Sequence, residues 1–465
     1  MRQDYVCWLS ALAGVVLLTG TVCQVRGGAT ITEVHGFDTY FNPSSLLQTE
    51  DGSLYGTIAG ATNCGMVFRI APNGSLSSFA SLNGNNGCPF EGGPLVKGLD
   101  GNLYGTTFAG GTNRFCRGTI FRLATNGILT TLVSFNGTNG WQPEAGLVLG
   151  PDGDFYGTTE FGGPSYKQSM MTPARVPGTV FKISAAGQFT TLVSFNRTNG
   201  ASPSARLVEG RDGNFYGTTV AGGPSESGTA FQMKPDGTLT TLTFFNGSNG
   251  SNPYGGLVLG SDGNLYGTTA HGGTNGFGTV FQLTTDGVLT ILASFKGTDG
   301  AYPFSGLVQG TDGILYGTTL YGGTGYDGSI NTGYGAVFGI TPAGVFTTLA
   351  LFEGVNGAHP RTELIQGADG SLYGTTFGGG SHGAGNVYRV DLPIAIHLPP
   401  QVGNNFSMTW NAVPGRTYQV QYKSEFTQTN WIDIGSVLTA TNTVATKTDS
   451  TAIDLQRFYR VIEAY

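Results

Sequence analysis

One seven-residue block constrains the fold of this chain more than any other feature. The block has the form Asp-Gly-x-[Leu/Phe]-Tyr-Gly-Thr and occurs seven times. Its tyrosines are Tyr55, Tyr104, Tyr156, Tyr216, Tyr266, Tyr316 and Tyr373, with spacings between 49 and 60 residues. A fixed period in this range is typical of propeller blades and related repeat architectures.

Each repeat unit also contains short segments with the composition of β-strands. In the fifth unit these segments are 256–260, 265–269, 278–283 and 289–295. The Asp-Gly pairs at 262–263 and 286–287 predict tight primed turns that join the first strand to the second and the third to the fourth. Longer loops span 270–277 and 296–304. Because consecutive strands alternate in direction, the long loops share one side of each unit, called here the long-loop face.

The two ends of the repeat region complement each other. The last unit ends with the strand-like segment 386–390 and lacks a fourth strand, whereas segment 31–37 near the N-terminus matches the fourth-strand pattern. Pairing these ends would remove the exposed edges of an open array. We therefore predict an all-β fold, a seven-bladed β-propeller closed by an N-terminal strand. A β-solenoid also stacks repeats, but it does not predict one unit split between the two ends.

Composition and charge narrow the function classes. The chain has 78 glycines, 11% charged residues, a formal charge of −7 and no run of Lys or Arg, so nucleic acid is not an expected partner. Segment 1–29 combines Arg2, an apolar run at 6–18 and small residues up to Ala29, which indicates a secretory signal peptide. The apolar run is too short to cross a bilayer, so we expect no membrane span in the mature chain. The alternative is a lipid anchor at Cys23.

The chain changes in character after the last repeat. We assign 30–391 to the propeller, 392–400 to a proline-punctuated linker and 401–465 to a small C-terminal β-sandwich. Polar and apolar residues alternate in this last part, as in half-buried strands. Trp410, followed by the alternating segment 418–422, is similar to a short fibronectin type III-like module.

The repeat itself resembles a known family. The Leu-Tyr-Gly-Thr-Thr blocks, followed by Gly-Gly and then Gly-Thr-Val-Phe, resemble the GloVer-type tandem repeat of the bacterial "choice-of-anchor" surface proteins over about residues 31–390. The resemblance implies a secreted protein in an extracellular or cell-envelope location, and it supplies no catalytic residues. Many members carry a C-terminal sorting segment with an apolar stretch and a basic tail. The segment 460–465 has neither, which leaves surface anchoring open.

Three cysteines remain beyond the predicted signal peptide. Cys64, Cys88 and Cys116 all fall in connections assigned to the long-loop face. We expect a disulfide between Cys64 and Cys88, which closes the shorter loop, and a free thiol at Cys116. No Cys-x-x-Cys spacing supports a zinc site.

Candidate binding residues lie next to a proline that recurs ahead of each first strand. These prolines are expected to ring the central channel on the long-loop face, and the side chains beside them differ between units. The candidates are Phe90, Trp141, Glu144, Tyr254, Tyr302, Phe304, His359 and Arg361. Aromatic faces with a few polar groups suit a sugar or a peptide. In the alternative interpretation, these aromatics only pack the loops together. Two loop insertions, 161–177 and 321–335, mark either a binding face or neutral drift.

Signals for catalysis or metal binding are weak. Neither a Gly-x-Ser-x-Gly nor a His-Glu-x-x-His motif occurs. His271, His359 and His382 share no spacing, and hairpin turns explain the Asp-Gly-Asn triplets, so no metal or cofactor is predicted. The expected function is a secreted or cell-surface binding or structural role that engages a glycan, a peptide or a surface protein. The alternative is a carbohydrate-active enzyme with funnel carboxylates such as Glu144 and Glu160.

Overall fold

The structure is a computed structural model. It describes residues 6–7, 29–38, 42–60, 64–89, 93–112, 116–164, 177–393, 396–397, 406–412, 415–425, 427–442, 444–450 and 458–464. Every regular element in this part is a β-strand. The chain divides into two compact units, 31–365 with 373–389 and 1–30 with 366–372 and 390–465. Each unit is described by itself.

The repeat region folds into antiparallel sheets that follow one strand order, first to fourth. The short first strands are β3 (Leu47–Gln48), β7 (Val96–Lys97), β11 (Val148–Leu149), β15 (Val208–Glu209), β19 (Val258–Leu259), β23 (Val308–Gln309) and β28 (Ile365–Gln366). The second strands carry the repeat tyrosine and are β4 (Leu54–Ile58), β8 (Leu103–Thr107), β12 (Phe155–Thr159), β16 (Phe215–Thr219), β20 (Leu265–Thr269), β24 (Leu315–Thr319) and β29 (Leu372–Gly378).

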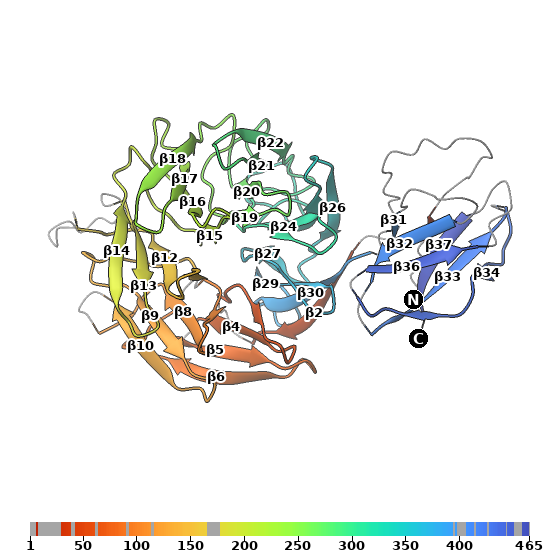
Figure 1. Cartoon of the computed structure of the whole chain (residues 1–465), viewed down its shortest axis with the longest axis horizontal. Helices are drawn as coiled ribbons and strands as arrows, with labels where there is room; N and C mark the ends of the chain where they lie inside the picture. Colours follow the sequence, from red (N-terminus) through yellow and green to blue (C-terminus); the bar gives the residue numbers. More distant parts are fainter. Residues whose placement is uncertain are drawn as a thin grey trace. The chain divides into compact units, whose positions relative to one another are not determined.

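The third and fourth strands complete the sheets. The third strands are β5 (Gly65–Ile70), β9 (Thr119–Leu123), β13 (Thr179–Ile183), β17 (Thr229–Met233), β21 (Thr279–Leu283), β25 (Ala336–Ile340) and β30 (Asn386–Asp391). The fourth strands are β6 (Leu76–Leu82), β10 (Leu129–Ser134), β14 (Phe189–Ser194), β18 (Leu239–Phe244), β22 (Leu289–Ser294) and β26 (Phe346–Leu351). Figure 1 shows these sheets side by side around a common centre, the arrangement of a β-propeller.

The N-terminal strand belongs to the sheet of the last repeat unit. That sheet has the order β2 (Thr30–Gly36), β30, β29 and β27 (Ala358–Pro360), with β28 also paired to β29. In Figure 1 the red β2 lies beside the blue β30. The carboxylate of Glu33 accepts hydrogen bonds from the Ser381 backbone N–H at 2.9 Å and from the Asn386 side-chain amide at 3.0 Å. These contacts join segments separated by about 350 residues of sequence.

The repeat motif is explained by a hydrogen bond between its first and fifth residues. In the fifth unit, the Tyr266 hydroxyl donates to Asp262 Oδ2 at 2.7 Å, and the Asn264 backbone N–H donates to Asp262 Oδ1 at 3.1 Å. The aspartate therefore holds its own turn and the buried tyrosine of the next strand. The same tyrosine–aspartate bond recurs in four other units, as Tyr104–Asp100, Tyr156–Asp152, Tyr216–Asp212 and Tyr316–Asp312.

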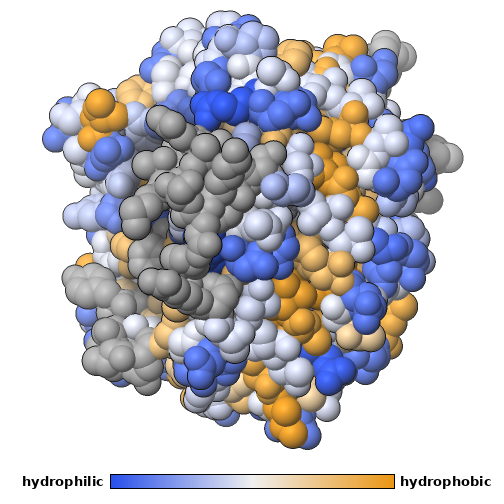
Figure 2. Space-filling model, turned by 90° about the vertical axis from the view of Figure 1, so that its left-hand side faces the viewer, coloured by the Kyte–Doolittle hydropathy of each residue, from blue (hydrophilic) through white to orange (hydrophobic). Residues whose placement is uncertain are grey.

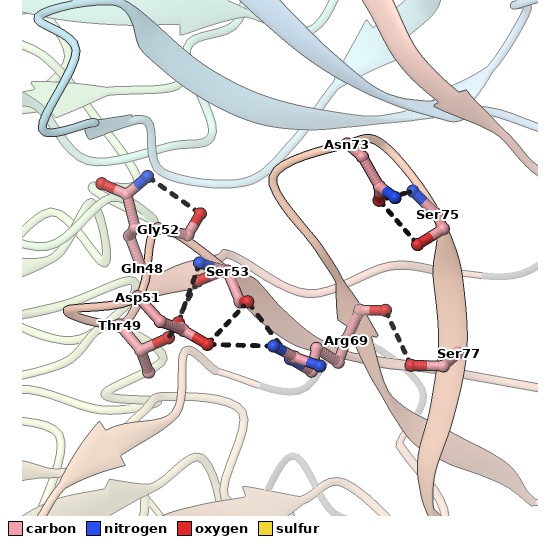
Figure 3. Close-up of polar contacts among 9 residues, drawn as sticks. All are labelled: Gln48, Thr49, Asp51, Gly52, Ser53, Arg69, Asn73, Ser75 and Ser77. Carbon is pink, nitrogen blue, oxygen red and sulfur yellow. Dashed lines mark hydrogen bonds and ion pairs between the residues drawn. The ribbon is translucent and has the colours of Figure 1, made fainter.

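The first unit uses a different partner at this turn. Figure 3 shows Arg69, on β5, reaching Asp51 Oδ2 at 2.9 Å and Ser53 Oγ at 3.1 Å. Thr49 Oγ1 also donates to Asp51 Oδ1 at 2.6 Å. The turn is thus held by an arginine and two hydroxyl groups, so the motif tolerates exchange of the group that satisfies its aspartate.

Packing also explains the Gly-Thr end of the motif and the threonine that follows it in six of the seven units. In the fifth unit, a Cβ added to Gly267 would lie 2.6 Å from Phe281 Cζ, so only glycine admits that ring. Thr269 Oγ1 lies 2.8 Å from Thr279 Oγ1 on the neighbouring strand, and both side chains are buried. Thr268 Oγ1 donates to the Ser305 carbonyl of the next unit at 2.9 Å. One threonine therefore links strands within a sheet and the other links neighbouring sheets.

The Asp-Gly turns differ from the expected primed type. The N–H of Gly263 donates to the Gly260 carbonyl at 2.9 Å, and the N–H of Gly260 donates to the Asn264 carbonyl at 2.7 Å. Gly263 has a φ of 87°, whereas Asp262 is not among the residues with positive φ. The loop is therefore a β-turn followed by one left-handed glycine, the geometry of a three-residue hairpin with a G1 bulge. The prediction of primed turns was wrong, because the loop contains three residues and of its Asp-Gly pair only the glycine has a positive φ.

On the side shown in Figure 2, the outer surface has no continuous hydrophobic face. Hydrophobic side chains there form narrow stretches bordered by hydrophilic ones. Among the described residues, single apolar side chains such as Ile128, Phe244 and Val288 are exposed by 62%, 41% and 58%. Scattered exposure of this kind is normal for the surface of a folded protein.

The turn aspartates predict how stability depends on pH. Burial raises the pKa of Asp262, but hydrogen bonds from Tyr266 and Asn264 outweigh it and leave this pKa below its usual range. The pKa values of Asp100 and Asp212 are lowered in the same way, and that of Asp152 is lowered mainly by a hydrogen bond from Lys182. A lowered folded-state pKa contributes stability above the unfolded value of about 3.9, and this contribution is lost as the pH falls through the folded value. We expect the melting temperature to fall progressively between about pH 5 and pH 2.

Calorimetry across this range, on the parent and on Asp262→Asn, tests this expectation. The variant should lose about 1 kcal/mol at neutral pH and show a weaker dependence in acid. A melting temperature that stays constant down to about pH 2 would contradict the role given to these carboxylates.

The C-terminal unit contains two sheets. One has the order β1 (Val6–Cys7), β37 (Phe458–Ala464), β33 (Thr417–Lys423) and β34 (Ile432–Asp433), with β35 (Leu438–Thr439) paired to β33. The other is β31 (Ile396–His397), β32 (Phe406–Asn411) and β36 (Val444–Asp449). Met408, Trp410, Val420, Tyr459 and Val461 form one core between them. This packing makes a small β-sandwich, and the fibronectin type III-like assignment stays a prediction.

Candidate binding pocket

A cavity of about 140 Å³ lies where the chain enters the first strands. We call it the central pocket. Its lining comes from the short segments that precede the first strand of every repeat unit, together with residues 375–377 of β29. The segments are 42–45, 93–94, 144–146, 204–206, 254–256, 304–306 and 361–363.

A backbone device positions the residues of these segments. The residue before the repeat proline adopts a left-handed conformation in several units, with φ of 56° at Gln142, 56° at Tyr302 and 58° at His359. Its N–H donates to a carbonyl of the preceding unit, as from Tyr302 to Phe277 at 2.9 Å. The proline then fixes the direction of the chain, because its ring restricts φ. In six of the units the residue after this proline lines the central pocket, and in the second unit that residue lies outside the described part of the chain.

Three of the predicted residues form a continuous row on one side of the central pocket. The rings of Tyr254 and Phe304 are stacked, with centroids 4.6 Å apart and an interplanar angle of 26°. The guanidinium carbon of Arg361 lies 5.4 Å from the Phe304 ring centroid. All three side chains are partly exposed and come from the fifth, sixth and seventh units. The row places two mutually stacked aromatic rings next to a guanidinium group.

The other predicted residues fall into different places. Glu144 lines the central pocket in the third unit, where it adds a carboxylate, together with Ser44 and Ser204 of other units. Phe90 lies outside the described residues. Glu160, the second carboxylate considered for catalysis, is not among the residues that line the central pocket.

Trp141, Tyr302 and His359 do not line the central pocket either. Trp141 lies under the Arg117 guanidinium at 4.5 Å and beside Phe161. Tyr302 is 6% exposed and contacts other rings edge-on, including Tyr321 at a centroid distance of 6.1 Å. These side chains pack the long loops against one another.

Burial affects the titration of two histidines in this packing layer. It lowers the pKa of His359, although a hydrogen bond with the Gly333 backbone partly offsets the effect. Burial also lowers the pKa of His271, whose ring lies 4.9 Å from that of Tyr302. Both rings therefore favour the neutral form near pH 7. Within the described residues, no group of three or more His, Cys, Asp and Glu side chains is arranged to hold a metal ion.

The sequence analysis missed two charged residues that line the central pocket, Arg206 and Glu363. They form an ion pair at 3.0 Å. Each directly precedes a buried leucine that lies just ahead of a first strand, where Gly256 and Gly306 stand in two other units. When the units are aligned on that leucine, Arg206 and Glu363 occupy the position at which other units have glycine.

The disulfide lies in the first two repeat units. Cys64 and Cys88 are bonded, with their Cα atoms 4.4 Å apart, and the exposed Cys116 carries a free thiol. Cys88 also pairs through its backbone with Ala109. The bond thus ties the loop between β4 and β5 to the entry segment of the second unit.

Removal of this disulfide has an expected cost. Its sequence separation of 24 residues corresponds to about 3.5 kcal/mol of stabilisation through restriction of the unfolded chain. We expect Cys64→Ala with Cys88→Ala to lower the free energy of unfolding in urea by that order, whereas Cys116→Ala should leave it nearly unchanged. Mass spectrometry of a non-reduced digest checks the pairing, and a peptide linking Cys88 to Cys116 would contradict it.

The comparisons with known proteins agree with the repeat architecture. The model of the Gloeobacter/Verrucomicrobia repeat matches residues 13–174 and 166–331. No curated protein sequence matches the chain. No helix long and apolar enough to cross a membrane occurs in the described part of the chain.

Two solved structures share the fold at low sequence identity. A catalytically inactive variant of virginiamycin B lyase from Staphylococcus aureus, solved with quinupristin, has a TM-score of 0.56 and 14% identity, over 78% of this chain and 100% of that one. The extracellular domain of a proposed hybrid two-component system from B. thetaiotaomicron has a TM-score of 0.50 and 12% identity, over 91% of this chain and 55% of that one. At these identities the likeness concerns the fold alone.

Proposed function

The chain belongs to the Gloeobacter/Verrucomicrobia repeat family, and on that basis we propose that it is an exported, seven-bladed β-propeller that binds a glycan in its central pocket. The observation that carries the proposal is the row of Tyr254, Phe304 and Arg361 along one wall of that pocket. Pyranose rings present apolar C–H faces that pack on aromatic rings, while their hydroxyl groups need donors and acceptors nearby.

Closure of the propeller is supported by contacts between the last and the first repeat units. Thr375 Oγ1 donates to the Ser44 carbonyl at 3.3 Å, which repeats the bond from Thr268 to Ser305 between neighbouring units. The Glu363 backbone N–H donates to Ser45 Oγ at 3.1 Å. The last unit thus uses the first as its neighbour, as in a closed ring of seven blades.

Export is supported by two features of different kinds. The N-terminal segment 1–29 has the pattern of a signal peptide, and a disulfide forms between Cys64 and Cys88. Disulfides persist in oxidising compartments outside the cytoplasm. A secreted or envelope-exposed protein would also meet extracellular glycans.

The competing proposal is a carbohydrate-active enzyme. It is favoured by one observation, that the carboxylates of Glu144 and Glu363 both line the central pocket. Glycoside hydrolysis needs two carboxylates that flank the scissile bond. The carboxylate of Glu363 is already engaged in an ion pair with Arg206, and Glu160, the second carboxylate considered for catalysis, does not line the pocket. Retention of an intact glycan therefore agrees better with the pocket than cleavage does.

One experiment tests the proposal and separates it from the alternative. The full chain without residues 1–29 is applied to a glycan array, and each bound glycan is then incubated with it in solution while released reducing ends are measured. We expect retention without release. Release of reducing ends would favour the enzyme, and an array without any bound glycan would refute the proposed function.

A further inference from the structure

The floor of the central pocket is crossed by an ion pair between distant repeat units. Arg206 Nε lies 3.0 Å from Glu363 Oε2, and the two residues belong to the fourth and seventh units. The side chain of Arg206 is 42% exposed and that of Glu363 is 17% exposed. The pair is therefore open to the pocket while its carboxylate is the more enclosed member.

Two glycines make room for this pair. A Cβ on Gly306 would lie 2.5 Å from Glu363 Oε1, and one on Gly256 would lie 3.0 Å from the same oxygen. A Cβ on Gly256 would also lie 3.5 Å from Arg206 Cγ. The pair thus lies directly over the fifth and sixth units, which have a glycine and therefore no side chain at this position. The Glu363 backbone N–H donates to Ser45 Oγ, so the backbone of this residue is held from the first unit.

The row of Tyr254, Phe304 and Arg361 comes from the same entry segments. Tyr254 and Phe304 each lie two residues before the glycine that underlies the pair, and Arg361 lies two residues before Glu363. The aromatic row and the ion pair therefore line one pocket, and in each of these units the two lining residues are separated by two positions along the chain. A sugar ring that enters the pocket and contacts this row therefore also meets the ion pair.

From this arrangement we infer that the central pocket recognises the terminal sugar of a glycan end-on, with two adjacent hydroxyl groups bound by the Arg206–Glu363 pair. A carboxylate beside a guanidinium offers an acceptor next to donors. Vicinal hydroxyl groups match this pattern, because one can donate to Glu363 while its neighbour accepts from Arg206.

The size of the pocket limits the ligand to a chain end. A cavity of about 140 Å³ is smaller than the roughly 300–1,000 Å³ of sites that enclose drug-sized ligands. Its volume is on the order of one sugar ring, and the Arg206–Glu363 pair lines the same pocket. This inference rests on the proposed glycan-binding function and specifies which part of the glycan is bound.

The test compares two matched carboxylate variants. Glu363→Gln keeps the size of the side chain but replaces an acceptor oxygen by an amide group. Glu226→Gln makes the same change in another ion pair, with Arg197 at 2.7 Å, whose residues do not line the central pocket. Arg206→Gln removes the same ion pair from its other member. Because the Arg206 side chain is the more exposed of the two, we expect this variant to fold. Thermal unfolding of each variant verifies that it is folded.

The glycans retained on the array are used as probes, in competition with free hexoses, 6-deoxyhexoses and pentoses at millimolar concentration. We expect at least one monosaccharide to displace the bound glycan. We also expect Glu363→Gln and Arg206→Gln to weaken glycan binding at least about tenfold, while Glu226→Gln leaves it unchanged. If the parent binds glycans but no monosaccharide competes and Glu363→Gln binds like Glu226→Gln, end-on recognition is refuted while glycan binding stands. If the parent binds no glycan, both proposals fail.

Discussion

Deletion of residues 29–38 is expected to cause the largest loss of stability of any change considered for the repeat region. The deletion removes β2, the outer strand of the sheet that contains β30 and β29. It also removes Phe37, which is 4% exposed and packs edge-on against Phe68 of the first unit at a centroid distance of 6.0 Å. Loss of a buried phenylalanine alone costs about 3–5 kcal/mol. The freed edge of β30 would also be available for pairing between molecules.

The measurement combines thermal unfolding with light scattering on the full chain and the deletion variant. We expect a melting temperature lower by more than 10 °C, or soluble aggregates in place of monomer. Phe37→Ala, which keeps the strand but removes the ring, should show part of the thermal loss without the aggregation. A deletion variant that is monomeric and as stable as the parent would refute closure by the N-terminal strand.

The repeat motif predicted the strands because its recurring residues all serve the scaffold. The tyrosine and aspartate hold each other across the turn, the glycine admits the phenylalanine of the next strand, and the threonines join strands and sheets. In the fifth unit the predicted segments 265–269 and 289–295 correspond to β20 and β22. Residues that recur for structural reasons carry no information on the ligand. That information lies where the units differ.

The lining of the central pocket could be predicted only in part. The repeat prolines marked the correct segments, but residues on either side of them were treated as equivalent. The left-handed conformation of Tyr302 and His359 separates them from Phe304 and Arg361, which lie one residue after the proline. A positive φ at a non-glycine residue before proline has no simple sequence signal. The Arg206–Glu363 pair was also missed, because it joins units that are not neighbours.

The stacked pair in the central pocket leads to the second large expected effect. Tyr254→Ala combined with Phe304→Ala should abolish most glycan binding and leave the fold intact. Both rings are partly exposed and belong to entry segments, so the strand ladders do not depend on them. Loss of the ligand's contacts with two aromatic rings corresponds to about 2–3 kcal/mol, or a dissociation constant raised about 30- to 150-fold.

Trp141→Ala is the matched control for this double variant. Trp141 is also a partly exposed aromatic residue ahead of a repeat proline, but it packs against Arg117 and Phe161 and does not line the central pocket. Its removal should lower the melting temperature slightly and leave glycan affinity unchanged. Isothermal titration with a glycan retained on the array measures all three proteins. Equal losses in the control and the double variant would mean that the aromatics act through loop packing, whereas a loss confined to Tyr254 and Phe304 would locate the binding surface in the central pocket.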